Sequence, residues 1–172
     1  MKIAFFKTES FRDVLVTWLT LGPYSHCEFL FSDWQCCGAT PINDAGVRWA
    51  PASIILTDLT KWDFLDLPLN VEQEDILRTW CDGEIGCKYD WNDILRFVLK
   101  FLPEDPDRWF CSEFCLAGIQ QIGMSSGLTC KLCLSDLQQI KMFSGLKACN
   151  YSPNRLYKIL VASGLKPTAY SS

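Results

Sequence analysis

The stretch Cys-Ser-Glu-Phe-Cys-Leu-Ala-Gly-Ile-Gln-Gln-Ile, residues 111–122, decides how the rest of this sequence is interpreted. Its apolar or small residues recur at the spacing of one helix face, and they are Cys111, Phe114, Cys115, Gly118, Ile119 and Ile122. The pattern predicts a buried helix that begins at Cys111. A thiol in the first turn of a helix lies near unpaired N–H groups and the positive end of the helix dipole, which favour the thiolate. We therefore expect a lowered pKa for Cys111 and treat it as a candidate nucleophile.

A nucleophilic cysteine needs a base, and the sequence contains one histidine, His26, so a Cys–His pair must use it. The aromatic and apolar residues around His26 predict a β-strand over residues 24–32. Glu28 shares the His26 face of that strand, which makes it the first candidate to hydrogen bond the imidazole. Such a group would fix the tautomer of the ring and stabilise the imidazolium. Gln35 and Thr40 are the alternative candidates for this role.

The oxyanion formed on a substrate would be stabilised by the backbone N–H of Cys111 at the start of its helix. Tyr89 is a candidate side-chain donor to it, and Ser112 is a second candidate for substrate or oxyanion binding. Each residue also has a structural interpretation, because cysteines are commonly buried, and a strand histidine or a core tyrosine commonly serves packing.

Besides the strand of His26, four further segments are predicted to form strands, namely residues 2–6, 34–37, 46–55 and 62–67. The first is a short apolar run that is typical of a buried strand. The last two are separated by polar and turn residues, which predicts an antiparallel meander with the strand of His26.

Helical spacing recurs in several other segments, each behind a residue suited to cap a helix: Ser10, Asn70, Asp90 and Ser152. Pro153 suits the first position of the last of these helices. Another helix is predicted over residues 134–142. Helices and a small antiparallel sheet together predict an α+β fold.

The composition is that of an ordinary globular protein, with 49% hydrophobic and 21% charged residues. A chain of 172 residues is long enough for one hydrophobic core, so we expect residues 1–172 to form a single domain. The net charge of -4 argues against a surface that neutralises phosphates, and nucleic acid is not an expected partner.

Charged residues from Lys7 onward interrupt the apolar N-terminal run before it reaches the length of a signal peptide or membrane span. We therefore expect no membrane insertion and a cytoplasmic location, with the ten cysteines reduced. Cys130 and Cys133 form a C-x-x-C pair, but no second pair or nearby histidine completes a zinc site. Neither a metal nor a cofactor is predicted.

Five short motifs then point to a known family: Tyr-Ser-His-Cys-Glu-Phe-Leu-Phe (24–31), Gly-Val-Arg (46–48), Lys-Trp-Asp (61–63), Lys-Tyr-Asp (88–90) and Trp-Phe-Cys-Ser-Glu-Phe (109–114). Together they resemble the circularly permuted NlpC-like branch of the papain-like superfamily. That branch includes small bacterial and phage proteins of the YiiX type and, more distantly, lecithin retinol acyltransferase-like enzymes. In it the histidine strand precedes the cysteine helix, as it does in this sequence.

The resemblance implies a permuted papain-like fold in which Cys111 is the nucleophile at a helix N-terminus, His26 is the base and Glu28 is the acidic residue that follows it. Tyr89 matches an aromatic residue near the pocket. A departure is Cys27, where a β-branched or small apolar residue is more usual. Its thiol is expected on the opposite strand face from His26, where it would serve packing.

The activity that the resemblance implies is that of a cysteine peptidase or amidase, cleaving a peptide or amide conjugate of cell-wall or other type. One alternative is an acyltransferase or thioesterase acting on lipid or thioester substrates, which an apolar tunnel beside Cys111 would favour. Another alternative is a bacterial or phage module that has the same fold and binds a ligand without catalysis. If the protein is phage-encoded, we expect it to act inside the host cell.

Overall fold

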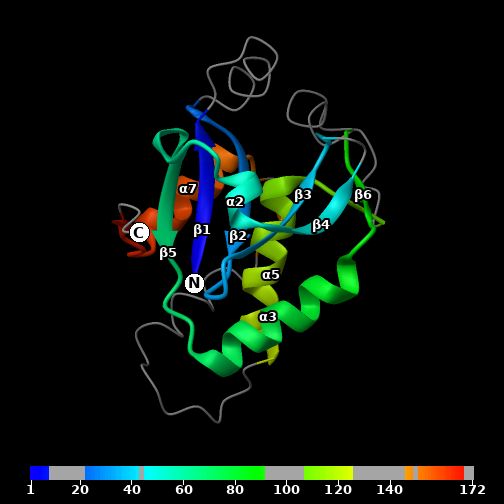
Figure 1. Cartoon of the computed structure of the whole chain (residues 1–172). Helices are drawn as coiled ribbons and strands as arrows, with labels where there is room; N and C mark the ends of the chain where they lie inside the picture. Colours follow the sequence, from blue (N-terminus) through cyan, green and yellow to red (C-terminus); the bar gives the residue numbers. More distant parts are fainter. Residues whose placement is uncertain (8–21, 43–44, 92–106, 126–145, 149–150, 169–172) are drawn as a thin grey trace.

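A computed structural model describes residues 1–7, 22–42, 45–91, 107–125, 146–148 and 151–168 (Figure 1). The helices predicted behind Ser10, behind Asp90 and over residues 134–142 lie outside the described residues, as do Cys130 and Cys133. The described part is an α+β structure in which an antiparallel sheet packs against helices, as the sequence predicts.

The sheet has six strands in the order β4-β3-β2-β1-β5-β8, and all its neighbouring pairs are antiparallel. The strands are β1 (Lys2–Lys7), β2 (Tyr24–Leu30), β3 (Gln35–Thr40), β4 (Gly46–Pro51), β5 (Trp62–Asp66) and β8 (Pro167–Thr168). The five strands expected from the sequence are therefore confirmed, and the two-residue strand β8 is added to them. A separate parallel pair, β6 (Lys88–Tyr89) and β7 (Arg108–Trp109), leads into the helix at Cys111.

The prediction of strand over residues 46–55 is wrong in its second half, because the strand ends at Pro51 and a short helix, α2 (Ala52–Ile55), follows. Proline has no N–H to continue a ladder, which accounts for the end of β4 at this residue. The expected meander is confirmed for β2, β3 and β4. However, β5 pairs with β1, whose residues Ile3, Ala4 and Phe5 are fully buried.

Three longer helices carry described residues: α3 (Val71–Glu84), α5 (Cys111–Ser125) and α7 (Pro153–Ala162). Helix α3 begins at the expected cap, where Asn70 and Gln73 form a reciprocal capping box. Helix α7 also begins as expected, because the Ser152 hydroxyl accepts a hydrogen bond from the N–H of Arg155. A 3-10 turn, η2 (Leu59–Lys61), precedes β5.

Helix α5 packs against β2 and β3 and is crossed by α3, while α7 packs against β2 (Figure 1). Its buried residues include the expected stripe of Cys111, Phe114, Cys115, Ile119 and Ile122. A second, smaller apolar cluster covers the opposite face of the sheet and includes Phe64, Leu30 and Trp62. Both faces of the central strands are therefore buried. No helix of the described residues is long and apolar enough to cross a bilayer.

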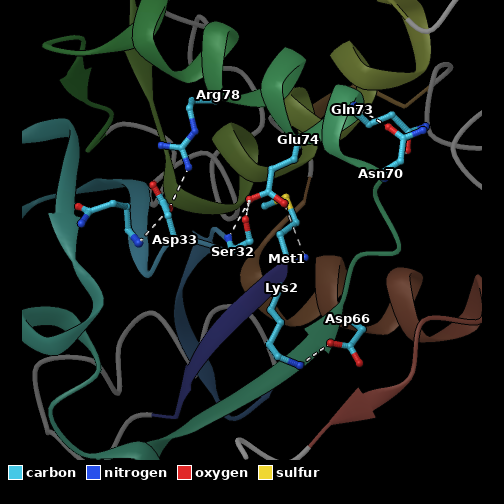
Figure 2. A network of polar contacts seen from close by, with 10 residues as sticks. Met1, Lys2, Ser32, Asp33, Asp66, Asn70, Gln73, Glu74 and Arg78 are labelled. Carbon is cyan, nitrogen blue, oxygen red and sulfur yellow. Dashed lines mark hydrogen bonds and ion pairs between the residues drawn. The ribbon is translucent and has the colours of Figure 1, made fainter. Parts of the chain in front are cut away.

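A polar network fastens α3 to one end of the sheet (Figure 2). The Glu74 carboxylate accepts hydrogen bonds from the N–H and the hydroxyl of Ser32, at 2.7 and 2.8 Å. Arg78 pairs with Asp33 at 2.9 Å, and Lys2 pairs with Asp66. Because Ser32 lies two residues beyond Leu30, the last residue of β2, this network lies at the opposite end of that strand from His26.

Candidate active site

Cys111 is the first residue of α5 and is completely buried. The helix begins after Phe110, whose carbonyl accepts from the N–H of Phe114 at 2.9 Å and whose N–H donates to the Glu113 carboxylate at 3.4 Å. Glu113 therefore contributes one half of a capping box. This cap fixes where the helix starts and so places the Cys111 sulfur at its N-terminus.

The sulfur of Cys111 lies against β2 where that strand parts from β3. The ladder between these strands joins Phe29 to Cys37 and Leu30 to Cys36 within the described residues. Cys27 precedes this ladder, and its backbone N–H donates a hydrogen bond to Cys111 rather than to β3. The opening in the sheet thus gives the cysteine helix direct access to the strand of His26.

His26 joins Cys111 to Glu28 through hydrogen bonds. Its Nε2 donates to Oε1 of Glu28 at 2.7 Å, which leaves Nδ1 as the nitrogen for the hydrogen bond to Cys111. The histidine side chain is 18% exposed and the Glu28 side chain 1% exposed. The three predicted catalytic residues therefore form one connected row, with the imidazole as the member that solvent can reach.

The electrostatics of the row favour a thiolate and an imidazolium. Burial alone would raise the pKa of Cys111, but hydrogen bonds from Cys27 and His26 and the charge of His26 outweigh it and lower the pKa to about 5. Burial alone would lower the pKa of His26, but Cys111 and Glu28 outweigh it and raise the pKa to about 10. Between these values the pair is charged.

Cys27 does more than the packing expected of it from the sequence. It lies in the core on the helix side of the sheet, and its side chain hydrogen bonds to both Cys111 and Cys115. Burial, followed by these two hydrogen bonds, raises the pKa of Cys27 well above its usual value, so Cys27 remains a neutral thiol that can donate to the Cys111 thiolate.

Arg48 on β4 is a site residue that the sequence reasoning did not single out. Its two terminal nitrogens donate to the two oxygens of Glu28, at 2.7 and 3.1 Å. Burial alone would raise the pKa of Glu28, but the hydrogen bonds and charges of His26 and Arg48 outweigh it and lower the pKa. In the sequence, Arg48 is marked by the Gly-Val-Arg motif that contains it.

The other predicted residues are distributed as follows. Tyr89 is buried, packs against Trp91 and Phe110, and lines the same pocket as His26. The Ser112 hydroxyl donates to the carbonyl of Tyr151. The Thr40 hydroxyl accepts from the N–H of Ile42. Gln35 lies at the far end of β3, opposite Pro51. Glu28 is thus the member of the three alternatives that hydrogen bonds His26.

A pocket of about 630 Å³ opens above His26, Glu28 and Arg48. Its walls are mainly apolar, formed by Phe6, Ile42, Ile54, Ile55, Trp62 and Trp91. Ile42, Ile54 and Trp91 are 68%, 65% and 53% exposed, which places large apolar side chains at the rim of the pocket. Among the described residues, no group of three or more His, Cys, Asp or Glu side chains is arranged to hold a metal ion.

Comparison of the sequence with models of known protein families gives no match, and comparison with curated proteins gives none.

Proposed function

We propose that the chain is a cysteine hydrolase that cleaves an amide through a covalent acyl-enzyme. The observation that carries this proposal is the buried row Cys111–His26–Glu28, in which the thiol pKa is lowered to about 5 and the imidazole pKa is raised to about 10. Strong pKa shifts of opposite sign in adjacent groups beside a pocket are typical of catalytic pairs.

In this proposal the Cys111 thiolate attacks the acyl carbon and the imidazolium of His26 gives its proton to the leaving amine. A water molecule then gives a proton to His26 and attacks the thioester, which releases the acid and regenerates the thiolate and imidazolium. Glu28 keeps the imidazole oriented and stabilises its charged form. The free backbone N–H groups of the first helical turn, at Cys111 and Ser112, would bind the oxyanion, joined by Tyr89.

The fold assignment that fits this function is the permuted papain-like one, with residues 1–172 as one catalytic domain. It is supported by the order of the elements, because the histidine strand β2 precedes the cysteine helix α5. It is also supported by the packing of α5 against an antiparallel sheet.

The apolar walls of the pocket favour a second candidate, an acyltransferase or thioesterase. Trp62 and Phe6 pack together with ring centroids 5.1 Å apart, and the Trp62 and His26 rings are T-shaped with centroids 6.4 Å apart. An apolar acyl chain could bury its surface against these rings while its carbonyl lies next to the imidazole. This function uses the same acyl-enzyme and differs in the leaving group and the acceptor.

One experiment tests both candidates. The purified chain is incubated with acyl p-nitroanilides and acyl thioesters of increasing chain length, and turnover and intact mass are followed. We expect a mass increase of one acyl group located on Cys111 by peptide mapping. Turnover of anilides would support the amidase. An increase in kcat/KM of about fourfold per added CH₂, with thioesters preferred, would support the second candidate. Absence of an adduct on Cys111 with every donor would contradict both.

A further inference from the structure

The Glu28 carboxylate is held from two sides. Its Oε1 accepts from Nε2 of His26 and from one terminal nitrogen of Arg48, both at 2.7 Å, while Oε2 accepts from the other Arg48 nitrogen at 3.1 Å. The guanidinium thus binds both oxygens in the planar, two-bonded geometry that suits arginine and carboxylate. Rotation of the carboxylate away from His26 would break both of these bonds.

Arg48 reaches Glu28 across an intervening strand, and Gly38 is the residue that allows it. On the sheet, Gly38 of β3 pairs with Arg48 of β4, and the ladder of β2 with β3 ends one residue after Glu28 at Phe29. A Cβ atom at Gly38 would lie 2.7 Å from Cγ and 3.1 Å from Cδ of Glu28. The Glu28 side chain therefore occupies the space that a side chain at position 38 would need.

A buried carboxylate without a cation tends to take up a proton, and a protonated Glu28 could no longer stabilise the imidazolium. Among the residues that the structure describes, the other titratable groups that act on Glu28, Arg48, His26 or Cys111 include the thiols of Cys27, Cys36, Cys37 and Cys115. A thiol is neutral in its protonated form. Within the described residues, Arg48 is therefore the permanent cation that faces Glu28.

We propose that Arg48 is a positioning residue for the reaction, which holds Glu28 ionised and turned toward His26, and that Gly38 provides the space for this arrangement. The inference rests on the proposed function, because it assigns Arg48 an effect on the reactive thiolate that is transmitted through Glu28 and His26. A buried arginine–glutamate pair is weak evidence for a stabilising role, since desolvation offsets much of its attraction. An effect on the reactivity of Cys111 is thus the property that distinguishes positioning from packing.

Loss of Arg48 has a definite expected direction. With less positive charge nearby, the pKa of Glu28 rises, and Glu28 stabilises the imidazolium less. The pKa of His26 then falls, and the pKa of Cys111 rises because the thiolate loses part of its counterion. The thiolate form of Cys111 is consequently less populated in mild acid.

The test is the rate of Cys111 alkylation by iodoacetamide as a function of pH, resolved from the other cysteines by mass spectrometry. For Arg48→Gln and for Gly38→Ala, we expect the pH at which Cys111 alkylation reaches half its limiting rate to rise by about one unit. Alkylation in mild acid then slows about tenfold. Arg48→Lys, which keeps the charge without the two-bonded geometry, should lie between Arg48→Gln and the unchanged protein. Arg78→Gln is the matched control, because Arg78 pairs with Asp33 at the far end of β2.

The outcomes separate the two proposals. In one outcome the unchanged protein reaches half its limiting alkylation rate at an acidic pH, and folded Arg48→Lys and Gly38→Ala do so at that same pH. This result would overturn the positioning role and leave the proposed function standing. An unchanged protein that does not reach half its limiting rate at an acidic pH would overturn both. If Arg48→Gln fails to fold, as judged by circular dichroism, the lysine and alanine variants still decide between these results.

Discussion

Replacement of Cys111 by alanine is expected to abolish turnover of acyl substrates, by a factor of about 10⁴ or more, while the chain keeps its fold. The sulfur is the atom that would form the covalent bond to the acyl group. Its loss removes one buried atom from the start of α5, which costs about 1 kcal/mol of stability or less. The measurement is turnover of the best substrate, together with a thermal unfolding curve.

Cys81→Ala is the matched control for this variant. Cys81 is also a completely buried thiol on a helix, α3, and its side chain hydrogen bonds to Cys37 rather than to Cys111, His26 or Glu28. We expect this variant to lose similar stability and to keep its activity. Full turnover in Cys111→Ala, or unfolding of Cys111→Ala with a folded Cys81→Ala, would show that Cys111 is a structural cysteine.

Replacement of His26 by alanine is expected to reduce turnover by about 10³-fold or more for amide substrates. The imidazolium has two tasks in the proposed reaction, because it stabilises the Cys111 thiolate and donates a proton to the leaving amine. A thiolate leaving group needs no such proton. The loss should therefore be smaller for a thioester than for an amide with the same acyl group, and the ratio of kcat/KM for the two substrates measures this.

An equal loss for both substrates would contradict the role of His26 as proton donor and leave it with the role of counterion. Unchanged turnover of both the amide and the thioester would show that His26 takes no part in the reaction. Glu28→Gln is a useful comparison, since it preserves the shape of the side chain but lacks the negative charge that stabilises the imidazolium.

The features that the sequence predicts well are local ones. The caps at Asn70 and Ser152 and the start of α5 at Cys111 follow from residue types within a few positions of each other. The contact of His26 with Glu28 follows from the two-residue period of a strand, which places both side chains on the same face.

The features that it misses depend on strand order and on pairing across the sheet. Arg48 reaches Glu28 because β3 lies between their strands and carries Gly38 at the crossing point, and no local pattern encodes this register. The hydrogen bond from the Cys27 N–H to Cys111 depends on the early end of the ladder between β2 and β3. Such contacts between distant segments require knowledge of the packed structure.

The most direct test of an activated Cys111 is its rate of alkylation by iodoacetamide from about pH 4 to pH 9, followed at this residue by mass spectrometry. With a pKa of about 5, half of the limiting rate should be reached near pH 5, and this limb should move toward the free-thiol value in His26→Ala. The result that would contradict an activated Cys111 is half-maximal alkylation only at the pKa of a free thiol, about 8.5, both with and without His26.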